Sequence, residues 1–130
     1  MNYFMTNLAA HVLIFSALIV VICIFADKVR KHKAKNIVLF FLPVALTIIV
    51  IVYGCLIVVP RMFDIRNVAA NNYSSAAGTV EKVAPLKNYI TVDGVTYYRN
   101  PAKECPEKGD VITFKYAEAS HFMPEWKNKK

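Results

Sequence analysis

The first half of the chain contains two long apolar runs. Residues 8–26 read LAAHVLIFSALIVVICIFA and carry no formal charge, and residues 37–60 read IVLFFLPVALTIIVIVYGCLIVVP. A helix needs about 20 apolar residues to cross roughly 30 Å of hydrocarbon. The pattern therefore predicts two transmembrane helices, over 8–26 and 37–60. Pro43 lies inside the second run, where we expect a modest kink that a neighbouring helix or Thr47 can accommodate.

The second half shows a different periodicity. From Gly78 onward, short runs of β-branched and aromatic residues alternate with polar positions, in TVEKV, NYITVDGVTYYR, VITFKY and SHFMPEW. Such runs predict four or five short strands. Asp93 and Gly94 join two of them and favour a tight type I′ hairpin, because glycine adopts a positive φ without steric cost.

These patterns predict an α+β membrane protein. Residues 1–60 form a two-helix transmembrane hairpin with a basic loop at 27–36, and residues 61–77 form a juxtamembrane linker that begins as a continuation of the second helix. Residues 78–126 form a small antiparallel β domain, either a barrel or a bent sheet, and 127–130 a basic tail. A domain of this size is only marginally stable alone and gains from packing against a partner or the membrane.

Composition and charge exclude several other classes of protein. Hydrophobic residues make up 56% of the chain and charged residues 19%, which excludes a disordered chain and a single soluble domain. The net charge is +7, but residues 67–130 hold nine bases and seven acids, a balance of only +2. The β domain therefore has no electrostatic footprint for nucleic acid.

The remaining positive charge sets the expected topology. One acid, Asp27, and five bases occupy the loop at 27–36, whereas no Lys or Arg precedes the first span and only Arg61 and Arg66 follow soon after the second. The positive-inside rule places this loop in the cytoplasm and both termini outside it. The short, loop-poor architecture is typical of bacterial proteins, so we expect the plasma (inner) membrane of a bacterium. No cleavable signal peptide is expected. The topology-determining residues are Lys28, Arg30, Lys31, Lys33 and Lys35.

The order of elements in the polar half resembles a known type of domain. A Gly-Thr-Val strand is followed by a hairpin, a Lys108-Gly109-Asp110 turn and a strand from Val111 to Tyr116. This order is similar to the small OB or SH3-like β-barrels that follow membrane helices in bacterial proteins, including NfeD-like proteins, which it resembles in layout only. The resemblance implies a small barrel over residues 78–126 and no functional residues.

We find no constellation of residues that predicts catalysis. The three histidines, His11, His32 and His121, lie in three separate segments, and the three cysteines show neither disulfide nor zinc spacing. Cys105 with His121 is the nearest approach to a nucleophile pair, but it lacks a third orienting group. The sequence therefore predicts a protein that is not an enzyme and has no catalytic residue, cofactor or metal.

The β domain is rich in aromatic residues that a partner protein could contact. Neighbouring residues of a strand face opposite sides, so Tyr97 and Tyr98 are not both expected in the core. Aromatic residues are also enriched in binding hot spots, and Trp126 follows directly on a Met-Pro-Glu segment. The predicted partner-binding residues are Tyr98, His121, Phe122 and Trp126.

The leading hypothesis is a non-enzymatic two-pass membrane protein that lies in the lipid bilayer and presents its extracytoplasmic β domain to another protein. One specific form is an immunity protein against a secreted or membrane-active toxin. The alternatives are an accessory subunit or regulator of a transport or secretion complex, and a homo-oligomeric small channel. A channel would use the polar residues of the spans, such as His11, Ser16 and Thr47.

The topology can be tested by labelling cysteines with a membrane-impermeant thiol reagent. In a Cys105→Ser background, Lys129→Cys should react in intact cells, because the C-terminus is expected outside. Lys31→Cys should react only after the cells are opened. Labelling of position 31 in intact cells would overturn the orientation.

Overall fold

The computed structural model describes residues 2–32 and 37–129. The chain divides into two compact units. One extends from Thr6 to Met62 and is helical, and the other joins the described residues up to Met5 with those from Phe63 onward. The second unit contains every strand of the described chain.

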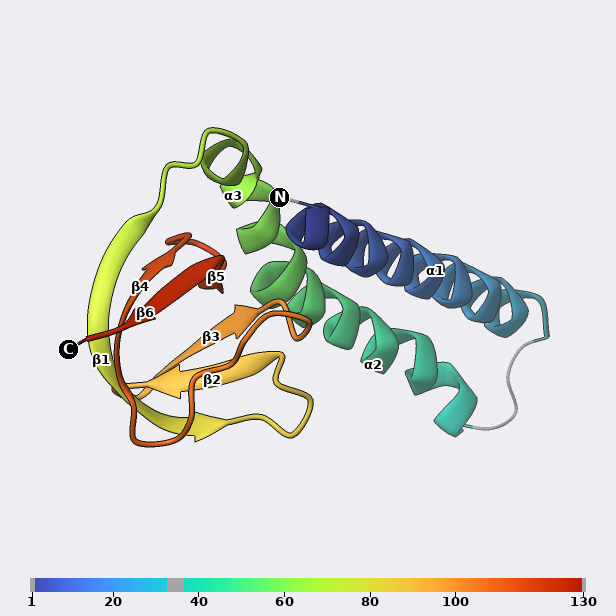
Figure 1. Cartoon of the computed structure of the whole chain (residues 1–130). Helices are drawn as coiled ribbons and strands as arrows, with labels where there is room; N and C mark the ends of the chain where they lie inside the picture. Colours follow the sequence, from blue (N-terminus) through green and yellow to red (C-terminus); the bar gives the residue numbers. More distant parts are fainter. Residues whose placement is uncertain (1, 33–36, 130) are drawn as a thin grey trace. The chain divides into compact units, whose positions relative to one another are not determined.

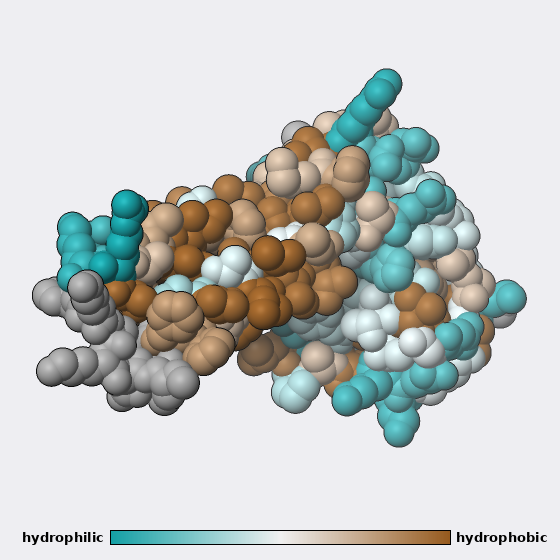
Figure 2. All heavy atoms as spheres, turned by 180° about the vertical axis from the view of Figure 1, so that it is seen from behind, coloured by the Kyte–Doolittle hydropathy of each residue, from teal (hydrophilic) through white to brown (hydrophobic). Residues whose placement is uncertain are grey.

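Two helices of the described chain are long and apolar enough to cross a membrane, Asn2–Lys31 and Phe40–Ala69, and most of each lies in the helical unit. Leu13 and Leu56 are 70% and 71% exposed, and Figure 2 shows a largely hydrophobic surface over these helices. Exposed apolar surface of this extent is unfavourable in water and suits lipid. The helical elements are α1 (Asn2–His32), α2 (Ile37–Tyr53), the π-helix η1 (Gly54–Val58) and α3 (Val59–Ala69).

The first helix extends beyond the apolar run at both ends. It begins at Asn2 and continues through the first part of the basic segment to His32. Lys28, Arg30 and Lys31 therefore lie in its last turns, where cations interact favourably with the helix dipole. Lys31 also pairs with Asp27 at 2.7 Å, one helical turn away. Of the predicted topology-determining residues, Lys33 and Lys35 lie outside the described residues.

The segment expected to link the spans to the β domain is largely structured. Helix α3 extends to Ala69, so the expected continuation of the second helix is confirmed. Strand β1 begins at Ser74, four positions before Gly78. It begins early because residues 74–79 pair with β4 and are drawn into the sheet, although their small side chains give little strand signal.

The second unit is built on a six-stranded sheet with the strand order β5-β3-β2-β1-β4-β6, which curls into a nearly closed barrel. The long strand β1 pairs with β4 through its first half and with β2 through its second half, and a register shift between Val80 and Lys82 lets it bend. The strands are β1 (Ser74–Val83), β2 (Tyr89–Val92), β3 (Val95–Arg99), β4 (Val111–Tyr116), β5 (Phe122–Met123) and β6 (Glu125–Asn128).

A single kinked segment brings the two ends of this sheet together. Strand β5 pairs in parallel with β3, and β6 pairs antiparallel with β4. Only Pro124 separates β5 from β6. Proline has no backbone N–H to donate to a ladder, so the segment can change partner there without losing a hydrogen bond.

The predicted hairpin at Asp93-Gly94 is confirmed. Both residues have positive φ, 47° and 78°, as a type I′ turn requires. The Asp93 carboxylate accepts a hydrogen bond from the Thr79 backbone N–H at 3.1 Å, which ties the turn to β1. Gly78 permits this approach, because a Cβ there would lie 2.6 Å from Val92 Cγ1 and closer still to the Asp93 carboxylate.

The barrel has an apolar interior and a smaller aromatic layer outside it. Tyr97 packs in the interior, whereas Tyr98 lies 5.0 Å from Phe122 between ring centroids, beside it on the neighbouring strand. Phe4 covers Phe122 at 5.2 Å. The two tyrosines do face opposite sides, but the expectation that one of them is available to a partner is wrong, because Tyr98 is buried against Phe122. The interior is formed by Val80, Ile90, Val92, Tyr97, Ile112, Phe114 and Met123.

A buried carboxylate holds the end of α3 against the barrel. Asp64 is 1% exposed and accepts hydrogen bonds from the backbone N–H and the hydroxyl of Ser120, both at 2.6 Å. Asn67 donates a further bond at 3.3 Å. A buried charge is tolerated only when it is hydrogen-bonded in this way. Val68, which is fully buried, completes the same face of the helix.

Replacing Phe4 tests whether the N-terminal residues are part of the barrel. Phe4 is 0% exposed, so Phe4→Ala should lower the free energy of unfolding by about 3 kcal/mol through lost packing and a cavity. Thermal unfolding in detergent, followed by the fluorescence of the single tryptophan, measures this. Phe63→Ala is the matched control, because Phe63 is 73% exposed and should change the melting temperature little. Equal effects of the two substitutions would contradict the packing.

Candidate functional site

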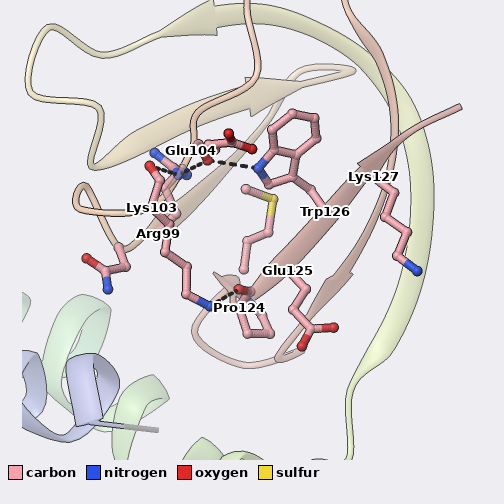
Figure 3. Close-up of a pocket in the computed structure, with 9 residues that line it drawn as sticks. Arg99, Lys103, Glu104, Pro124, Glu125, Trp126 and Lys127 are labelled. Carbon is pink, nitrogen blue, oxygen red and sulfur yellow. Dashed lines mark hydrogen bonds between the residues drawn. The ribbon is translucent and has the colours of Figure 1, made fainter.

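A groove of about 350 Å³ opens beside the kinked segment of the barrel, where the segment leaves β3 and joins β4 (Figure 3). One wall is the loop after β3, and the other is β6. The groove is open to solvent and mixes charged, aromatic and aliphatic side chains. It is lined by Arg99, Asn100, Lys103, Glu104, Met123, Pro124, Glu125, Trp126 and Lys127.

A buried guanidinium shapes the loop wall. Arg99 is the last residue of β3 and is only 2% exposed. Its guanidinium donates to the backbone carbonyls of Lys87 at 2.7 Å and Lys103 at 2.9 Å, and also to the Glu104 carbonyl. Arginine suits this role because its planar fork presents several donors in fixed directions. It thereby joins the loop before β2 to the loop after β3.

Two further hydrogen bonds fix the loop to the opposite wall. The indole Nε1 of Trp126 donates to the Glu104 carbonyl at 2.9 Å, and Lys103 Nζ donates to the Pro124 carbonyl at 3.1 Å (Figure 3). Glu104 thus accepts from both Arg99 and Trp126. The two walls are held at a defined separation, and a preorganised site of this kind loses less entropy on binding.

Strand β6 presents one edge to β4 and the other to the groove. The Lys129 N–H donates to the Val111 carbonyl on β4. Alternate residues of a strand direct their backbone groups to the same edge, so those of Lys127 also face β4. The backbone N–H and C=O groups of Trp126 and Asn128 therefore point to the groove edge. No backbone hydrogen bond to that edge is found in the described part of the chain.

The groove has a positive electrostatic balance. Its lining holds three bases (Arg99, Lys103, Lys127) and two acids (Glu104, Glu125). One of these acids, Glu125, already pairs with Lys115 at 3.4 Å. Arg99 and Lys103 donate to carbonyl oxygens instead of carboxylates, and carbonyl dipoles leave their net charge in place.

Three of the four predicted partner-binding residues, Tyr98, His121 and Phe122, lie together outside the groove, where the Tyr98 N–H donates to the His121 carbonyl. Trp126 lies in the groove and is partly buried. Tyr98 and Phe122 are 4% exposed, so neither offers a free surface. His121 has a positive φ of 53° and holds the turn before β5, with its ring 5.4 Å from the Tyr97 ring.

Burial raises the pKa of Tyr97, and Tyr116 and Asp93 add to that shift, so its hydroxyl stays neutral.

Sequence reasoning missed the two residues that shape the groove, Arg99 and Lys103. An arginine at the end of a strand and a lysine in a loop with Pro101 are ordinary solvent-exposed residues by pattern. Only the return of β5 and β6 past this loop buries Arg99. No local signal in the sequence carries that information.

A second cavity, of about 420 Å³, lies beside Cys105. Cys105 is partly buried and packs against the barrel interior, and Glu81, Lys87 and Lys108 also line this cavity. His121 is not among its lining residues. Within residues 2–32 and 37–129, no three His, Cys, Asp or Glu side chains are grouped to hold a metal ion.

In the helical unit, polar residues are paired across the two helices. His11 Nδ1 and the Tyr53 hydroxyl share a hydrogen bond of 2.6 Å, so Tyr53 faces the other helix as its depth in the apolar run suggests. Arg61 donates to the side-chain carbonyl of Asn7 at 3.1 Å and to the Ile57 backbone carbonyl at 2.7 Å. Such pairing satisfies polar groups that lipid cannot.

A close approach of the helices accompanies these pairs. A Cβ at Gly54 would lie 2.9 Å from the Phe15 ring, and Phe15 also stacks on Tyr53. Gly54 begins the π-helical turn η1, a type of irregularity that is frequent at functional sites. Thr47 uses its hydroxyl within its own helix, donating to the Pro43 carbonyl at 2.7 Å.

No protein-family model, curated protein or solved structure matches the chain. The arrangement of two long apolar helices followed by a small, nearly closed barrel agrees with the layout that the resemblance implied.

Replacing Arg99 tests how the groove is held. Arg99→Lys should lower the free energy of unfolding by about 2 kcal/mol, because one ammonium cannot replace a fork that reaches carbonyls on two loops. The Trp126 emission should shift to longer wavelength as its bond to Glu104 loosens. Lys82→Arg, an exposed exchange between the same two residue types, is the control and should leave melting temperature and emission unchanged. If Arg99→Lys changed neither the melting temperature nor the Trp126 emission, the role of the guanidinium would be contradicted.

Proposed function

We propose that this chain is a two-pass protein of the bacterial plasma membrane whose extracytoplasmic barrel binds another protein, without catalysis. The observation that carries the proposal is the groove beside Trp126. It is fixed from within the protein, open to solvent and placed on a barrel that follows two apolar helices. We place loop 27–36 in the cytoplasm and both termini outside, as the distribution of bases favours.

The character of the groove supports protein binding. A partly buried tryptophan, backbone groups at a strand edge and positively charged lysine side chains are the groups that recognise a polypeptide. The hydrogen bonds from Trp126 to the Glu104 carbonyl and from Lys103 to the Pro124 carbonyl already hold the Trp126 side chain and the loop wall in place. The connectivity of the barrel, in which β5 pairs in parallel with β3, resembles that of OB-type barrels.

The specific form that we propose is an immunity protein. Such a protein remains in the producer's membrane and intercepts a secreted or membrane-active toxin before it acts. A small barrel with a preformed groove on the outer side of the membrane suits this task, because the toxin would meet it first. This step is an analogy of architecture, and the groove itself would serve any protein partner.

Two other functions remain as alternative proposals. As an accessory subunit or regulator, the chain would use the same groove to attach to a larger transport or secretion complex. As a channel, it would self-associate and line a pore with polar residues of its helices. The hydrogen bond between His11 and Tyr53 favours the first alternative over the second, because it engages these groups within one chain.

The proposal is tested by purifying the full-length protein from its native cells in a mild detergent and measuring the mass of the intact complex. We expect a different protein in fixed ratio. Trp126→Ala should reduce its affinity about 30-fold, as for a hot-spot residue worth about 2 kcal/mol. Tyr89→Ala removes an exposed aromatic residue elsewhere on the barrel and should retain the partner.

Each result has a definite meaning. A toxin as the partner supports the immunity form, and a transport or secretion machine supports the accessory-subunit form. A homo-oligomer alone, reproducible in several detergents, overturns the binding proposal and favours the channel. A partner that Trp126→Ala and Tyr89→Ala retain equally shows that binding occurs outside the groove.

A further inference from the structure

We propose that the groove accepts an extended acidic segment of the protein partner, which adds to the barrel as a strand along the free edge of β6. This inference rests on the proposed function and specifies the chemistry of the partner. It follows from three features of the barrel unit, namely the direction of the β6 backbone groups, the charge of the groove and the residues that protect the edge.

The backbone of β6 supplies the pairing groups. Lys127 and Lys129 direct theirs to β4, so the N–H and C=O groups of Trp126 and Asn128 are left for an incoming strand. A strand that pairs with these two residues would form several main-chain hydrogen bonds, the usual source of affinity when a peptide adds to a sheet edge. Pro124 ends the available edge on one side, because it has no N–H.

The side chains favour negative charge on that strand. The two lysines of the groove, Lys103 and Lys127, lie on opposite walls (Figure 3). With Lys115 included, which neutralises Glu125, four bases face two acids. The Lys127 side chain can reach a carboxylate on the incoming strand, and Lys103 adds positive potential while it remains bonded to the Pro124 carbonyl. Complementary charge of this kind directs association.

Lys127 disfavours pairing between two copies of this chain. In an antiparallel pair of β6 strands centred on Lys127, the two Lys127 side chains would meet, and like charges opposite one another destabilise a sheet. A lysine, a proline and a short strand are also the usual features that keep an edge from associating with itself. The edge is therefore suited to a different, acidic strand.

The test uses full-length protein in nanodiscs of neutral lipid, with the backbone amides of Trp126 and Asn128 observed by NMR. The probes are the blocked peptides (Glu-Val)₄ and (Lys-Val)₄. We expect saturable shifts of both amides with the acidic peptide only, weakening as salt is raised. Lys127→Glu should weaken binding about tenfold, because it replaces an attraction by a repulsion. Lys82→Glu, an equal charge change on an exposed residue of β1, should not.

Absence of saturable shifts at Trp126 and Asn128, or equal binding of both peptides, overturns the inference. So does acidic-peptide binding that Lys127→Glu leaves unchanged. The same variant, used in the purification from native cells, separates this inference from the proposed function. A partner that Lys127→Glu retains in fixed ratio leaves the proposed function in place and refutes the acidic strand, whereas no partner with the unmodified chain refutes the proposed function.

Discussion

The barrel depends on one chain segment that changes partner at a proline. Before Pro124 the segment pairs with β3, and after it with β4. One continuous segment thus joins the two ends of the sheet and curls it into a nearly closed barrel. This near-closure protects most of the sheet from edge-to-edge association and leaves the outer edge of β6 unpaired. The change of partner also separates β6 from the loop after β3, and this separation is the groove. The fold and the candidate site thus have the same physical origin.

The groove keeps its shape because a cation is buried in its wall. Burying a guanidinium is costly unless its donors are satisfied, and Arg99 is satisfied by backbone carbonyls from two loops. Those carbonyls would otherwise need other donors, since loops supply few regular hydrogen bonds. The arrangement orders the loops and leaves positive charge near the surface. A carboxylate partner would have ordered the loops equally well but would have removed that charge.

The apolar helices follow the same rule of satisfying polar groups internally. The pairs His11–Tyr53 and Asn7–Arg61 join the two helices at two levels, about one turn apart on the first helix and about two turns apart on the second. Hydrogen bonds of this type contribute only about 1 kcal/mol each in a membrane, but they distinguish one pairing of two otherwise uniform apolar surfaces from others. Gly54 adds to this selection by admitting the Phe15 ring. The pairs thereby favour a single register of the helices.

The sequence by itself determined the two apolar helices, the continuation of the second helix, the hairpin at Asp93-Gly94 and the strand character of the second half. Each is set by residues close together in the chain, through length, alternation or turn chemistry. The tertiary structure alone decided that Phe4 covers Phe122, that Arg99 is buried and that Trp126 borders a groove. These features join residues distant in sequence, and burial is a property of that packing, which no local pattern encodes.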